Sequence, residues 1–132
     1  MKKILVIDDD EITRYLLAKV LQKAGYAVVT AEDGEHGMML LRSECPDAVI
    51  TDMIMPQGDG VETIIRIRRE QPRVRIIAIS GGGKFKTAHV LTAAEALGAD
   101  VVLAKPLQPA ELLRCLEYPS PDAIQQPAAS RP

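Results

Sequence analysis

Residues 4–10 read ILVIDDD, in which four branched apolar residues run directly into the three carboxylates Asp8, Asp9 and Asp10. Branched apolar residues are typical of a buried strand. Two like charges about 4 Å apart repel by roughly 1 kcal/mol in water and roughly 4 kcal/mol near a protein surface. The acids therefore oppose folding unless a cation offsets their charge, and the stretch predicts a core strand that ends at a cation site.

The same strand pattern recurs along the chain, separated by stretches with helical spacing. Short apolar runs rich in β-branched residues occur at Ile4–Ile7, Ala27–Thr30, Ala48–Thr51, Val74–Ile79 and Val101–Ala104. All except the second are almost continuously apolar, as expected of parallel strands covered on both faces. The alternation predicts an α/β fold in which βα units surround a five-stranded parallel sheet.

The stretches between the strands carry helix signals. Asp10 is predicted to cap the first helix, and Gly25 stands where a left-handed C-terminal cap would lie. This helix is expected to bury one apolar stripe: Ile12, Leu16, Leu17, Val20 and Leu21. Further helices are predicted over Gly34–Arg42, from about Val61 with Asp59 as its cap, over Val90–Leu97 with Gly98 behind it, and from Pro109 over Leu112, Leu113 and Leu116.

Length and composition favour one domain. The chain has 132 residues, of which 47% are hydrophobic, enough to bury a core. We expect the domain to span residues 1–118. Residues 119–132, which read PSPDAIQQPAASRP, are expected to be a proline-rich tail or linker stub.

The charge, the N-terminus and the cysteines limit the partners and the location that we expect, and the cysteines favour a cytoplasmic protein. The formal net charge of −2 gives no electrostatic reason to expect nucleic acid or an anionic membrane as a partner. The N-terminal apolar run is too short for a signal peptide or a membrane span. Cys45 and Cys115 are far apart without metal-ligand spacing, so we expect reduced thiols.

Reactive side chains follow four of the five predicted strands. Asp8 and Asp9 follow the first, and the third, fourth and fifth are followed by Asp52, Ser80 and Lys105. Parallel sheets of this kind bind ligands beyond the carboxyl ends of their strands. Each residue alone could be a cap, a turn residue or an ordinary surface group, but together they predict one site.

Three carboxylates, a hydroxyl and an amine suit phosphoryl chemistry with a hard divalent ion. Mg²⁺ uses one or two carboxylates and keeps waters for phosphate oxygens, so Asp9 and Asp52 would be enough. One carboxylate oxygen could then attack phosphorus. Lys105 and Ser80 would contact the phosphoryl oxygens.

Four segments together resemble the receiver domain of two-component response regulators: LVIDDD, TDMIMPQGDG, IAIS and LAKP, within a resemblance that runs from about Lys2 to Tyr118. The resemblance implies a flavodoxin-like sheet of order 2-1-3-4-5 with five flanking helices. It also implies that Asp52 accepts a phosphoryl group from a sensor histidine kinase or a histidine phosphotransfer protein. Such a domain signals to a downstream protein, here unknown, and is not a turnover enzyme.

The resemblance assigns further roles by position. Asp9, Asp52 and the backbone carbonyl of Ile54 would bind Mg²⁺, and Asp8 would act through water. Ser80 and Lys105 would contact the phosphoryl group, and the Lys105–Pro106 peptide bond is expected to be cis. We expect a monomer or a weak dimer.

Three positions depart from the family pattern. Val102 stands where receivers commonly carry an aromatic switch residue. Gly81, Gly82 and Gly83 follow Ser80, so we expect movement of residues 81–87 to replace the aromatic rotor. Because the apolar Ile54 side chain cannot orient an attacking water, we expect slow loss of the phosphoryl group.

Rival functions remain open on sequence alone. A receiver-like binding module that is never phosphorylated is one. A Mg²⁺-dependent aspartyl phosphatase would want a second aspartate where Ile54 stands, and a flavin module would offer hydroxyls and amides in place of Asp8–Asp10. His36 and His89 lack partners at metal spacing, and a solvated face is predicted for the basic cluster Arg66, Arg68, Arg69, Arg73 and Arg75.

Overall fold

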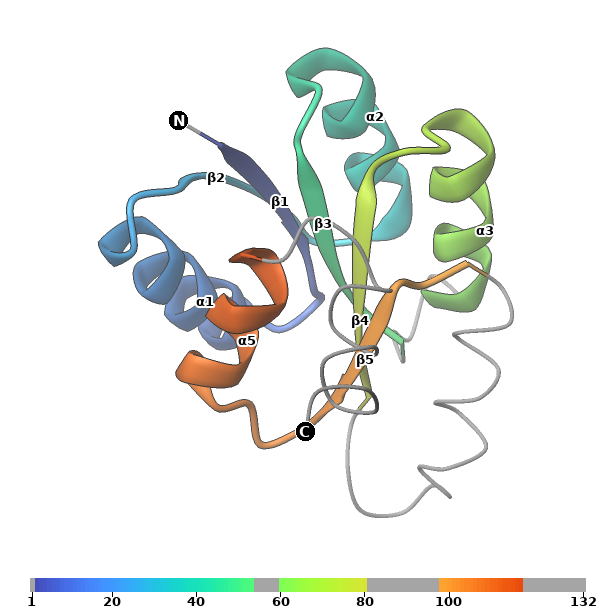
Figure 1. Ribbon diagram of the computed structural model, residues 1–132. Helices are drawn as coiled ribbons and strands as arrows, with labels where there is room; N and C mark the ends of the chain where they lie inside the picture. Colours follow the sequence, from blue (N-terminus) through green and yellow to red (C-terminus); the bar gives the residue numbers. More distant parts are fainter. Residues whose placement is uncertain (1, 54–59, 81–97, 118–132) are drawn as a thin grey trace, which may run out of the picture.

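The computed structural model describes residues 2–53, 60–80 and 98–117. Its strands are all parallel and lie in the order β2-β1-β3-β4-β5 (Figure 1). The strands are β1 (Lys3–Ile7), β2 (Ala27–Ala31), β3 (Ala48–Asp52), β4 (Arg75–Ser80) and β5 (Val101–Ala104). The helices within these residues are α1 (Glu11–Lys23), α2 (Gly34–Glu44), α3 (Gly60–Glu70) and α5 (Pro109–Glu117).

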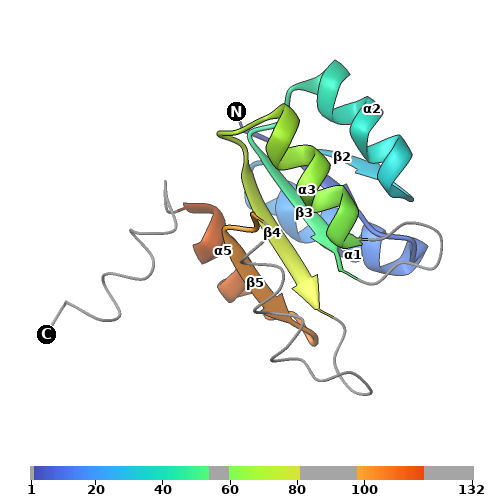
Figure 2. The same cartoon turned by 90° about the vertical axis from the view of Figure 1, so that its right-hand side faces the viewer.

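Helices cover both faces of the sheet, α2 and α3 on one and α1 and α5 on the other (Figures 1 and 2). Alternate residues of β1 feed two cores: Leu5 and Ile7 join the cluster with α2 and α3, whereas Ile4 and Val6 join the cluster with α1 and α5. The predicted α/β fold and strand order are therefore confirmed. The helix predicted over Val90–Leu97, the Asp59 cap and the tail after residue 118 lie outside the described residues.

The ends of α1 follow the sequence prediction, but its buried face does not. The Asp10 side chain accepts a hydrogen bond from the Thr13 backbone N–H, and Gly25 has a φ of 100°. Only Leu17 and Leu21 are buried, whereas Ile12 is 68% and Leu16 is 56% exposed. At about 100° per residue Ile12 lies about 140° around the helix from Leu17, so one sheet face cannot cover the whole apolar stripe.

The solvated face predicted for the basic cluster is wrong for two of its members. Arg68 donates hydrogen bonds to the carbonyls of Gly98, Pro72 and Val74 and to the Asp100 carboxylate, which ties α3 to the segments entering β4 and β5. The Arg75 Nε donates to the Cys115 carbonyl at 2.8 Å. Both residues are half-buried, and both donate to backbone carbonyls near the ends of helices or strands.

Cys45 and Cys115 are both free thiols. Within residues 2–53, 60–80 and 98–117, no helix has the length and apolar character to cross a bilayer.

Candidate functional site

The predicted site residues meet at the carboxyl edge of the sheet. Asp52 is the last residue of β3 and pairs in register with Ile79, and Ser80 pairs with Ala104 of β5. The Lys105 N–H donates to the Ser80 carbonyl at 3.0 Å. Since β1 lies next to β3, Asp8 and Asp9 reach the same edge.

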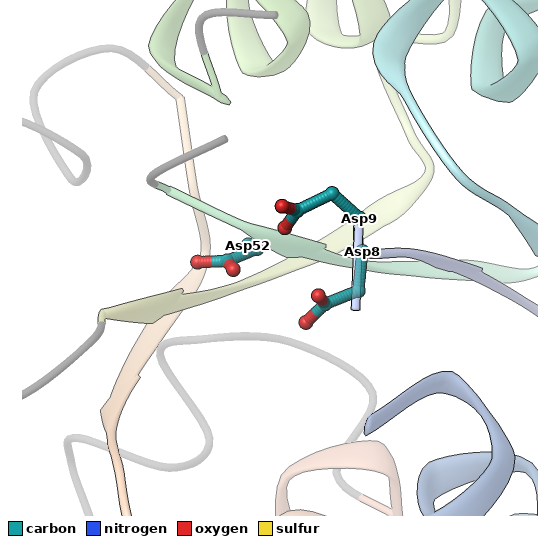
Figure 3. A group of neighbouring side chains, drawn as sticks. All are labelled: Asp8, Asp9 and Asp52. Atoms are coloured by element: carbon teal, nitrogen blue, oxygen red, sulfur yellow. The ribbon is translucent and has the colours of Figure 1, made fainter. Parts of the chain in front are cut away.

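Three carboxylates form the centre of this edge. One oxygen from each of Asp8, Asp9 and Asp52 lies within 4.8 Å of the others (Figure 3). Asp8 is 1% and Asp52 is 5% exposed, whereas Asp9 is exposed to solvent. The group therefore opens outward on the Asp9 side.

The Asp8 carboxylate is buried without full compensation of its negative charge. Its Oδ1 accepts a hydrogen bond from the Asp10 backbone N–H at 2.9 Å, but its buried Oδ2 has no hydrogen-bond partner among the described residues. Burial, with a smaller contribution from the Asp52 and Asp9 charges, raises the pKa of Asp8 from 3.8 to about 6. A buried carboxylate oxygen that lacks a donor and faces two further carboxylates fits a divalent cation with oxygen ligands.

Lys105 supplies the positive charge beside the acids. Its Nζ lies 3.7 Å from the Asp52 Oδ2. The predicted cis peptide bond between Lys105 and Pro106 is confirmed. Ser80 is fully buried at the end of β4, one strand away from Asp52. One amine, one hydroxyl and three carboxylates are thus collected within a few residues of four strand ends.

The loop between β1 and α1 is held by residues that sequence reasoning did not single out. Arg14 of α1 donates from Nη1 to the Asp8 carbonyl at 2.7 Å. The Thr13 hydroxyl also donates to Asp10, and these two bonds from Thr13 are the main reason why the pKa of Asp10 is lowered. Asp10 therefore serves as the helix cap. The role of Arg14 could not be predicted from hydrophobic periodicity, which does not show which carbonyl a charged side chain will contact.

The remaining positions singled out in the sequence lie away from the acidic group or outside the described residues. Val102 is half-buried and packs against the core shared with α2 and α3. His36 lies in α2 and belongs to no metal-binding group of the described residues. Ile54, Gly81–Gly83 and His89 lie outside the described residues.

The sequence matches the response regulator receiver domain family over residues 4–117. The chain belongs to this family. The receiver domain is also similar to a receiver structure from Clostridium thermocellum, with a TM-score of 0.82 and 28% identity over 97% of this chain and 98% of that one. Membership of this chain in the receiver family of two-component systems agrees with its fold and with the acids, the lysine and the hydroxyl at its strand ends.

Two curated relatives are transcriptional regulators. The receiver domain is 40% identical over 111 residues to the probable transcriptional regulator ycf27 of Guillardia theta, covering 84% of this chain and 42% of that protein. It is 35% identical, again over 84% of its length, to the alkaline phosphatase synthesis transcriptional regulatory protein PhoP of Bacillus subtilis, of which it covers 45%. The chain thus spans less than half the length of each.

Proposed function

We propose that this receiver domain takes a phosphoryl group on Asp52 from a phosphohistidine of a sensor histidine kinase or a histidine phosphotransfer protein. The observation that carries the proposal is the buried Asp52 carboxylate, grouped with two further acids and placed 3.7 Å from the Lys105 ammonium. The phosphorylated form would signal to a downstream protein by contact, as a cytoplasmic switch without substrate turnover.

The acid group suits Mg²⁺, with Asp9 and Asp52 as direct ligands, Asp8 acting through water and the Ile54 carbonyl as a further ligand. When bound, the ion would neutralise the acids and allow an anionic phosphoryl group to approach. An Asp52 carboxylate oxygen then forms a bond to phosphorus as the bond from phosphorus to the histidine nitrogen breaks. The electron pair of the broken bond stays on that nitrogen.

Lys105 and Ser80 would hold the transferred group. The Lys105 ammonium can move from the Asp52 carboxylate to a phosphoryl oxygen, and the Ser80 hydroxyl can donate a hydrogen bond to another. With Val102 in place of an aromatic rotor, residues 81–87 would carry the conformational change. The apolar Ile54 would make the phosphorylated form long-lived.

The phosphodonor protein would cover the surface beside Asp52. An apolar groove between α1 and α5 begins at Lys105, the residue that pairs with Asp52. Ile12, Tyr15 and Leu16 are exposed on α1. Because a histidine must come within bonding distance of Asp52, its domain has to contact the neighbouring surface, and we propose that these apolar side chains receive it. The groove is lined by Thr13, Leu16, Leu17, Val20, Lys105, Pro106, Leu107, Pro109 and Leu112.

Intact mass spectrometry tests the phosphorylation directly. The chain would be incubated with Mg²⁺ and acetyl phosphate, and we expect a gain of one phosphoryl group. The gain should be absent in the Asp52→Asn variant and in EDTA. If the wild-type chain gains no mass from acetyl phosphate or from phosphorylated histidine kinases, the domain is a binding module and the proposal is wrong.

A further inference from the structure

Gly60 begins α3 and lies against the backbone of the strand that carries Asp52. A Cβ atom at this position would stand 2.4 Å from the carbonyl oxygens of both Asp52 and Met53. The φ of Gly60 is outside the left-handed region, so its backbone conformation does not demand glycine. What demands glycine here is space: the start of α3 approaches the end of β3 too closely for any side chain.

Two other glycines make equally close approaches, but to side chains. A Cβ at Gly37 would lie 2.5 Å from the Ile7 Cδ1, and one at Gly34 would lie 2.5 Å from the Thr63 Oγ1. Atoms at the ends of side chains can move by rotation about χ angles. The carbonyls beside Gly60 are main-chain atoms, and Met53 is fixed by its N–H, which donates to the Ile79 carbonyl at 2.8 Å.

Relief of the contact at Gly60 therefore requires a backbone shift. Cβ contacts under 3.0 Å essentially never occur, so the start of α3 and the end of β3 would have to separate by about 0.6 Å. Functional groups must be held within roughly 0.5 Å of the productive geometry. A separation of this size next to Asp52 would change its placement relative to Asp9 and Lys105.

We propose that Gly60 is a positioning residue for Asp52. Because Gly60 has no side chain, the start of α3 can pack directly against the Asp52 and Met53 carbonyls, and this contact fixes the position of the phosphoacceptor carboxylate. This inference rests on the proposed function for the meaning of the site, but its main readout is metal binding. Gly60 acts through the backbone and contacts no reacting atom.

The test compares Gly60→Ala with Gly37→Ala. Both variants insert one methyl group into a similarly close contact, but only the first meets the backbone of Asp52. Mg²⁺ affinity would be measured by NMR titration of the ¹⁵N-labelled chain, folding by thermal melting, and phosphorylation by acetyl phosphate with intact mass. Sucrose would be included so that both variants are folded during the titration.

We expect Gly60→Ala to weaken Mg²⁺ binding about tenfold and to slow phosphorylation by about tenfold or more. Gly37→Ala should lower the melting temperature and leave Mg²⁺ affinity within about twofold of wild type, since a displaced Ile7 methyl does not move the acids. A purely structural role for Gly60 would lower the melting temperature in the same way without a change in affinity.

Each outcome decides the proposal. Unchanged Mg²⁺ affinity in Gly60→Ala, or equal losses in both variants, would overturn it. A Gly60→Ala chain that stays unfolded in sucrose would also overturn it, since glycine would then serve the fold as a whole. If wild type binds Mg²⁺ but is never phosphorylated while Gly60→Ala binds it tenfold more weakly, the positioning role stands and the proposed function fails.

Discussion

Replacement of Asp8 by asparagine should stabilise the metal-free chain at neutral pH. The pKa of Asp8 is raised from 3.8 to about 6, mainly because the carboxylate is buried. One pKa unit corresponds to 1.36 kcal/mol, so ionised Asp8 lowers the free energy of unfolding by at most about 3 kcal/mol. Asparagine keeps the oxygen that accepts from the Asp10 N–H and replaces Oδ2, which has no partner in the described part of the chain, with an NH₂ group.

The pH dependence follows from the direction of the shift. Because the pKa of Asp8 is higher in the folded chain, the group does not destabilise the fold below pH 3.8, where it is protonated in both states. The penalty grows as the pH rises from 3.8 to about 6 and is complete above that. The advantage of Asp8→Asn should therefore be about 1–3 kcal/mol at pH 7.5 and should shrink below about 1 kcal/mol at pH 4.

Urea unfolding measures this at pH 4 and pH 7.5, in EDTA and in Mg²⁺. Excess Mg²⁺ should reverse the order at pH 7.5, since a ligand that binds only the folded state stabilises the chain that binds it more tightly. The reasoning would be refuted if Asp8→Asn were less stable than wild type at pH 7.5 in EDTA, or equally advantaged at both pH values.

Three further predictions concern the core, a half-buried arginine and the lifetime of the phosphorylated form. Leu17→Ala should lower the free energy of unfolding by about 2–5 kcal/mol and Leu16→Ala by less than about 1 kcal/mol, since only Leu17 is buried; equal losses in urea unfolding would show that α1 buries both. Arg68→Gln should cost about 2–4 kcal/mol because several carbonyls lose their donor, whereas the exposed Arg69→Gln should cost little, and thermal melting would show whether the two differ. Ile54→Asn should lose its phosphoryl group faster than wild type, as followed by intact mass; equal or slower decay would count against a role of Ile54 in lifetime.

The strand ends were predictable because polar residues follow apolar runs and parallel strands bring these ends to one edge. Asp52 and Lys105 could therefore be expected to meet although 53 positions separate them in the chain. The Asp10 cap could also be predicted, because a short acidic side chain just before an apolar helix commonly accepts a hydrogen bond from the N–H groups of the first turn.

The face of α1 and the basic cluster were not predictable, for different physical reasons. Periodicity shows that Ile12 and Leu17 can share a broad apolar stripe, but the width that neighbouring elements cover depends on tertiary packing. A run of arginines shows charge, but which carbonyls need donors depends on where chain ends meet, as with Arg68 at Gly98. The role inferred for Gly60 likewise depends on a backbone approach that no local pattern encodes.

The three acids at the carboxyl ends of β1 and β3 differ in the surroundings that act on their charge. Asp9 is exposed to solvent, Asp52 has the Lys105 ammonium at 3.7 Å, and Asp8 is buried, which raises its pKa to about 6. A cation bound by the group would therefore favour the ionised form of Asp8, which is disfavoured in the metal-free chain. Phosphorylation of Asp52 would convert its carboxylate into an acyl phosphate and draw the Lys105 ammonium toward a phosphoryl oxygen, and Lys105 also lines the apolar groove between α1 and α5. Lys105 thus belongs both to the charged group at the strand ends and to the proposed partner surface. A Lys105→Met variant should therefore alter both phosphorylation and partner contact.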